Sequence, residues 1–144
     1  MKKIELFYEP RKKATSSFPF PDGEPEMSEF ESAFLCGLIK EMNPRKILEI
    51  GIAAGGTTAI ILQCLDILKI NDSTELYSID ILERFYRGNG EQSGYLADII
   101  KEKLTGPCQH KCYLGVPLHS VIDEIGKDID FVIIDTAHIL PGEA

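Results

Sequence analysis

The sequence predicts an α/β fold built on a doubly wound parallel sheet, and three observations lead to this prediction. Four short apolar segments are typical of buried strands, at residues 46–52, 75–80, 110–115 and 130–135. Segments with helical spacing of apolar residues alternate with them, which is typical of βαβ units. The strands are almost continuously apolar, as expected when helices cover both faces of a sheet.

The first predicted helix covers residues 28–42 and precedes the first strand. Ser28 and Glu31 fit a capping box, in which each side chain satisfies a free backbone N–H at the helix start. Pro44 ends the helix, because the residue before a proline disfavours the helical conformation. The apolar residues with helical spacing would form one face: Phe30, Phe34, Leu35, Leu38, Ile39 and Met42.

The other elements follow in alternation. Helices are predicted at about residues 56–68 and 95–104, and Pro117 suits the first turn of a last helix that reaches Ile125. Right-handed crossovers between parallel strands then give a Rossmann-like sheet. Residues 1–27 are rich in Pro, Lys, Glu and Ser, and we predict an extended N-terminal arm there, ahead of one domain over residues 28–144.

The composition of the chain limits the classes of binding partner that it can have. The formal net charge of -8 makes nucleic acid a poor partner, because the chain would repel phosphate. No apolar run approaches the ~20 residues that span a bilayer, and the start lacks the apolar segment of a secretory signal. We therefore expect a cytoplasmic protein with no membrane partner.

Three possible metal ligands alternate near the third strand, Cys108, His110 and Cys112. A strand would place them on one face, but no fourth ligand is evident. We therefore predict no metal site and favour small, buried side chains on a core strand, with all four cysteines as reduced thiols.

Residues with ligand-binding chemistry follow the first two strands. Ligands of open α/β sheets bind beyond the carboxyl ends of the strands. There, small residues at positions 51, 53, 55 and 56 let the backbone approach a ligand closely, and the next helix directs free N–H groups at it. The second strand ends in Asp80, whose carboxylate suits a ribose diol.

Together these motifs resemble the class I S-adenosylmethionine-dependent methyltransferases. The first motif is Glu49-x-Gly51-x-Ala53-x-Gly55, with alanine in place of the family's middle glycine. Asp80 matches the second acidic position. Asp135 matches the aspartate after the fourth strand, and Asp135-x-x-His138 is similar to the ending found in a bacterial small-molecule branch.

The resemblance spans about residues 28–144 and implies the N-terminal, cofactor-binding half of a fold with strand order 3-2-1-4-5-7-6. Only four strands, in order 3-2-1-4, are expected here, so the sheet would be incomplete after the fourth strand. The apolar strand 131–134 would then form an edge that invites pairing with a second copy or a partner chain.

The resemblance implies S-adenosylmethionine as the cofactor. Gly51, Ala53 and Gly55 would lie against its amino-acid part, Glu49 would organise the loop or meet the amino group, and Asp80 would hold the ribose hydroxyls. Thr57 completes the cofactor-binding candidates, and Asp135 and His138 are the catalytic candidates. Structural roles remain open for most of these: a tight strand-to-helix turn for Gly51 and Gly55, a loop cap for Glu49, a helix cap for Asp80, a solvated strand end for Asp135 and a surface position for His138.

Three functions compete at this stage. The first is methyl transfer to a small molecule, in which proximity and orientation do much of the work. The second is a truncated module that holds the cofactor without catalysis. The third is a nicotinamide-binding domain, since Gly51-x-Ala53-x-x-Gly56 partly fits that fingerprint; against it, Asp80 lies 29 residues after Gly51 instead of about 20.

Overall fold

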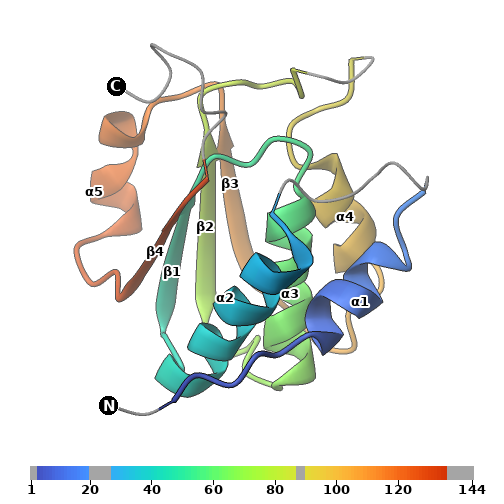
Figure 1. The fold of residues 1–144 in the computed structure, drawn as a ribbon. Helices are drawn as coiled ribbons and strands as arrows, with labels where there is room; N and C mark the ends of the chain where they lie inside the picture. Colours follow the sequence, from blue (N-terminus) through green and yellow to red (C-terminus); the bar gives the residue numbers. More distant parts are fainter. Residues whose placement is uncertain (1–2, 20–26, 87–89, 136–144) are drawn as a thin grey trace.

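In the part of the chain that the structure describes, four parallel strands form a sheet in the order β3-β2-β1-β4 (Figure 1). The computed structural model describes residues 3–19, 27–86 and 90–135. The strands are β1 (Lys46–Ile50), β2 (Glu75–Asp80), β3 (Gln109–Leu114) and β4 (Phe131–Ile134). The predicted fold class and strand order are confirmed.

Helices lie on both faces of this sheet (Figure 1). On one face are α2 (Glu29–Met42), α3 (Gly56–Ile67) and α4 (Tyr95–Lys101), and on the other is the short α5 (Ile122–Ile125), preceded by a 3-10 turn, η1 (Leu118–Ser120). The hydrophobic core likewise has two parts, one on each face of the sheet. Ile47, Leu76 and Ile133 face the larger cluster with α2 and α3, whereas Leu48 and Ile79 face α5.

Helix α3 lies in the centre of the larger layer, and nearly all of its residues are buried. A helix that is apolar on every side needs neighbours on every side. The sheet, α2, α4 and a further helix, α1 (Glu9–Thr15), supply them. None of the helices in the described part of the chain is long and apolar enough to cross a membrane.

The prediction of an extended N-terminal arm is wrong over residues 9–15, where the chain forms α1. Pro10 stands in the first turn, where its fixed φ suits a helix start. The buried residues of α1 are Pro10 and Ala14, which lie four positions apart on one side of the helix. Two small side chains are enough for a close contact with α3, but they make too weak an apolar pattern to be recognised in the sequence. The part of the predicted arm at residues 20–26 lies outside the described residues.

The predicted capping box at the start of α2 is confirmed, whereas the predicted apolar face is correct for Leu35 and Ile39 and wrong for three other large side chains. The Glu31 N–H donates to Ser28 Oγ, and Glu31 Oε1 accepts from the Ser28 N–H, both at 3.1 Å. Phe30, Phe34 and Met42 are exposed, Phe30 by 62%. The buried side is formed by small residues together with two aliphatic ones: Ser32, Ala33, Leu35, Cys36, Gly37 and Ile39.

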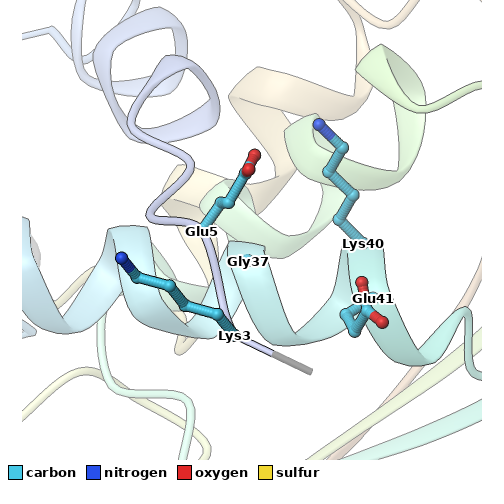
Figure 2. A pocket seen from close by; sticks show the side chains of 5 residues that line it. All are labelled: Lys3, Glu5, Gly37, Lys40 and Glu41. Atoms are coloured by element: carbon cyan, nitrogen blue, oxygen red, sulfur yellow. The ribbon is translucent and has the colours of Figure 1, made fainter. Parts of the chain in front are cut away.

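Small residues face inward on α2 because residues 3–8 run closely along it. The Phe7 N–H donates to the Ala33 carbonyl at 3.0 Å, and a Cβ on Gly37 would lie only 2.2 Å from the Glu5 carbonyl oxygen. An open cavity of about 400 Å³ lies beside this crossing. Figure 2 shows the residues that line it: Lys3, Glu5, Gly37, Lys40 and Glu41. It lies along the second half of α2, which leads to the amino end of β1, and so away from the carboxyl ends of the strands.

Candidate functional site

The loop between β1 and α3 lies at the carboxyl end of the sheet, as predicted. Three of its residues have positive φ: Gly51 (94°), Ala53 (51°) and Gly55 (94°). The Gly51 N–H donates to the Ile79 carbonyl at 2.8 Å, which fixes the loop against β2. Ala53 adopts a conformation that costs an ordinary L-residue about 1–2 kcal/mol. Backbone strain of this kind is frequent at functional sites.

Asp80 holds this loop from the end of β2. Its Oδ2 accepts from the N–H groups of Ile52 and Ala53 at 2.8 and 2.9 Å, and its Oδ1 accepts from the Leu82 N–H at 2.9 Å. Asp80 therefore has a structural role in the loop. A carboxylate oxygen has two lone pairs, so Oδ1 retains one with which it can accept from a ligand hydroxyl.

Glu49 lies fully buried beneath the same loop. Its Oε1 accepts from Thr58 Oγ1 at 2.6 Å and from Ser78 Oγ at 2.7 Å. Its Oε2 has no hydrogen-bond partner within the described part of the chain. Burial raises the pKa of Glu49 to about 7; the two hydroxyls oppose this rise, and the charges of Asp135 and Asp80 add to it. Glu49 thus titrates near neutral pH.

Asp135 follows β4 and reaches the same edge. Its N–H donates to the Ile50 carbonyl at 2.8 Å, and its Oδ2 lies 3.4 Å from Thr57 Oγ1 in the first turn of α3. Glu49, Asp80 and Asp135 therefore bring three carboxyl groups to the ends of three adjacent strands. Such a group creates a negative potential that favours a cationic ligand. His138, the other catalytic candidate, lies outside the described residues.

The start of α4 contacts the loop, a feature that the sequence analysis missed. The Gly94 N–H donates to the Ala53 carbonyl and the Leu96 N–H to the Ala54 carbonyl, both at 2.9 Å. A Cβ on Gly55 would lie 2.8 Å from Gly94 Cα, so the two backbones touch. Gly94 stands in a segment with several glycines, so the sequence held no signal that set it apart.

Ser78 was also missed, and His110 was considered only as a possible metal ligand. Ser78 lies opposite Glu49 in the register of β1 and β2. His110 Nε2 lies 2.9 Å from Ser78 Oγ and 3.4 Å from Cys112 Sγ. Burial, together with the charge of Lys101, lowers the pKa of His110 to about 3. The available signal was a polar residue inside each of two neighbouring strands, and it did not stand out because the strand of His110 also contains Gln109 and Lys111.

The expectation of small, buried side chains around His110 is wrong for Cys112, which is exposed. The reason is the strand order: β3 is the outer strand beside β2, so its residues have fewer neighbours. In the described ranges, no three His, Cys, Asp or Glu side chains are grouped so that they could hold a metal ion.

No protein-family model matches the chain, and no curated protein sequence matches it. Solved structures that share its fold include an SAH-bound methyltransferase from Podospora anserina (TM-score 0.57, 16% identity), cofactor-bound Rv0187 from MTB (0.57, 17%) and a candidate O-methyltransferase from Klebsiella pneumoniae (0.56, 18%).

The likeness covers 89%, 88% and 90% of this chain but only 48%, 51% and 50% of those chains, in the same order. The chain therefore spans about half the length of the solved structures it matches. At this level of identity the likeness shows the fold, a Rossmann-like parallel sheet.

Proposed function

We propose that this chain is related to the class I methyltransferases, that it binds S-adenosylmethionine at the loop of residues 51–57, and that it serves methyl transfer to a small molecule. One observation carries the proposal: a strained, glycine-bearing loop is surrounded by the carboxyl groups of Glu49, Asp80 and Asp135. The cofactor offers the matching chemistry, since it has an ammonium group, a sulfonium and a ribose diol. Two of the three structural neighbours are described as bound to SAH or to a cofactor.

The proposed contacts follow the geometry. The backbone of Gly51, Ala53 and Gly55 would lie against the amino-acid part of the cofactor, close to the first turn of α3. Glu49 would supply negative charge from beneath the loop. The remaining lone pair of Asp80 Oδ1 would accept from a ribose hydroxyl.

Asp135 and His138 are the residues that we propose as catalytic. Thr57 supports this for Asp135, because its hydroxyl lies near the Asp135 carboxylate at the start of α3. A base is needed only when the methyl acceptor must lose a proton. Asp135 and His138 are the candidates for that step.

The second candidate function is a module that binds the cofactor without catalysis. The observation that favours it is that the loop and the carboxyl groups beside it could hold the cofactor in such a module as well. A nicotinamide cofactor has less support. Asp80, the acid that would have to hold its ribose, lies 29 residues after Gly51 instead of the roughly 20 typical of that fingerprint.

The proposed setting is the cytoplasm, with a small molecule and not nucleic acid as the substrate. We further propose that a second copy or a partner chain pairs with β4. Within the described residues β4 is an edge strand, and Val132 and Ile134 are 52% and 68% exposed. An exposed apolar edge favours pairing with another strand.

Calorimetric titration tests the binding site directly. S-adenosylhomocysteine should bind the wild-type chain and NAD should not. Replacing Asp80→Ala should weaken S-adenosylhomocysteine binding by about 1.5–3 kcal/mol, the size of a hydrogen bond to a charged group. Asp72→Ala is the matched control, because it removes the same charge from an exposed turn before β2.

Because Asp80 also holds the loop, Asp80→Asn should accompany these variants. The amide keeps one oxygen that can accept from the loop N–H groups. If the wild type binds NAD instead, or if Asp80→Ala binds S-adenosylhomocysteine as tightly as Asp72→Ala does, the assignment is wrong.

A further inference from the structure

A row of polar side chains crosses the sheet beneath the loop. Glu49 of β1 lies opposite Ser78 of β2, and Ser78 lies opposite Cys112 of β3. His110, two residues before Cys112, reaches back to Ser78. The hydrogen bonds are Ser78 Oγ to Glu49 Oε1 at 2.7 Å and His110 Nε2 to Ser78 Oγ at 2.9 Å. The row thus links the carboxyl group beneath the loop to the outer strand of the sheet.

The direction of these bonds follows from the number of protons. Ser78 has one hydroxyl proton, and an ionised Glu49 can only accept, so Ser78 donates to Glu49. Ser78 Oγ must then accept from His110, which places the imidazole hydrogen on Nε2. The other nitrogen, Nδ1, is buried and has no partner among the described residues. An Nδ1 that carries no hydrogen is the form found in a neutral imidazole, which agrees with the lowered pKa of His110.

We propose that Ser78 and His110 are positioning residues that hold Glu49 in its ionised form, His110 acting through Ser78. This rests on the proposed function, because the negative charge of Glu49 makes the loop attractive to a cationic cofactor. Each donor in the row stabilises the carboxylate and leaves a neutral carboxyl group less favoured. Thr58 of α3 adds a second hydroxyl to the same oxygen.

The charged groups around this row shift the pKa values of Glu49 and His110. Asp80 at the end of β2 and Asp135 after β4 both raise the pKa of Glu49, as burial does. Lys101 of α4 opposes protonation of His110. Cys112 is kept as a thiol: although the residue is exposed, the atoms around its sulfur partly desolvate it and raise its pKa to about 11, and Lys101 opposes the rise. The hydroxyls of Ser78 and Thr58 are therefore the groups that favour the charged form of Glu49.

Carbon-13 NMR of the Glu49 carboxyl group tests the proposal in the ligand-free protein. The wild-type midpoint should lie near the pKa of about 7. Ser78→Ala removes a hydrogen bond to a charged oxygen and should raise the midpoint by about one pH unit or more. His110→Phe keeps a ring but loses the donor, and should raise the midpoint by about half a pH unit.

Two conservative variants separate this role from a merely structural one. His110→Gln places an N–H donor near the position of Nε2 and should restore the wild-type midpoint. Thr58→Ser keeps the other hydroxyl and should leave the midpoint unchanged. Loss of packing alone would make His110→Gln and His110→Phe behave alike, and this outcome would overturn the proposal. The two histidine variants decide the matter even if Ser78→Ala fails to fold.

The test is independent of the cofactor. If the Glu49 midpoint responds as expected but S-adenosylhomocysteine does not bind, the proposed function fails and the role of Ser78 and His110 stands. If S-adenosylhomocysteine binds but the midpoint is the same in Ser78→Ala, His110→Phe and the wild type, the site stands and the positioning role is wrong.

Discussion

Strands β1 and β4 are neighbours in the same sheet, yet their surroundings differ. β1 contains a lysine and a glutamate, and all but its last residue are buried. β4 is entirely apolar, and two of its four residues are exposed. β1 is paired on both sides, whereas within the described residues β4 pairs only with β1 (Figure 1). Position in the sheet therefore decides burial here, and composition does not.

The largest expected difference between these strands is in stability. Ile47→Ala in β1 should lower the free energy of unfolding by about 2–5 kcal/mol, because the side chain is fully buried. Ile134→Ala is the matched change in β4 and should cost less than about 1 kcal/mol. Denaturant unfolding measures both. Equal losses would show that β4 is as well covered as β1.

A second effect comes from the carboxyl group inside β1. Burial raises the pKa of Glu49 from 4.5 to about 7, so the folded state binds its proton more tightly than the unfolded state does. The resulting stability is fully present below the unfolded pKa and is lost as the pH rises through the folded pKa. The total loss is on the order of 3 kcal/mol.

Glu49→Gln should remove this dependence, because the amide does not titrate. The stability difference between the wild type and Glu49→Gln, measured by denaturant unfolding from about pH 4 to pH 8, should shift against the wild type as the pH rises. A constant difference would show that Glu49 has the same pKa in both states.

The edge of β4 should control association. We expect the apparent mass of the wild type in light scattering to rise with concentration. Ile134→Lys should weaken this association by roughly tenfold or more, since charged residues block edge pairing. Phe30→Lys, on the exposed side of α2, is the control and should associate as the wild type does. Loss of association in both variants, or a wild type that stays monomeric, would contradict the assignment to β4.

The smallest expected effect concerns the turn that follows β1. Ala53 has a φ of 51°, which glycine adopts without steric cost. Ala53→Gly should therefore raise the free energy of unfolding by about 0.5–1 kcal/mol, after subtraction of the extra chain entropy of glycine. Thermal and denaturant unfolding measure it. Ala54→Gly is a suitable control, since Ala54 does not have positive φ, and it should be destabilising.

Much of the fold could be predicted because the strands are short apolar runs separated by clear turns. The strand β2 was predicted at its observed bounds, and the capping box at Ser28 was predicted correctly. The helix α1 and the buried side of α2 could not be predicted. Both depend on small residues such as Ala14 and Gly37, whose burial follows from which distant segment contacts them.

The candidate site likewise has one part that could be predicted from the sequence and one part that could not. Glu49, Asp80 and Asp135 could be placed together because the carboxyl ends of parallel strands meet at one edge. Ser78 and His110 could not be found, since their contact depends on the register between strands. The three backbone bonds that Asp80 accepts were hidden for a related reason: they form only when the loop has adopted its strained shape.

The contact of Gly55 with Gly94 makes the first turn of α4 an intrinsic reporter of the loop. No side chain separates the two backbones, and the amides of Gly94 and Leu96 are hydrogen bonded to carbonyls of the loop itself. The rates at which these two amides exchange hydrogen with solvent will therefore depend on how often the loop leaves the conformation that these hydrogen bonds hold. A molecule that orders the loop will slow exchange at these two amides, whatever its identity, so a mixed library of small molecules can be screened without a label or an assay for turnover.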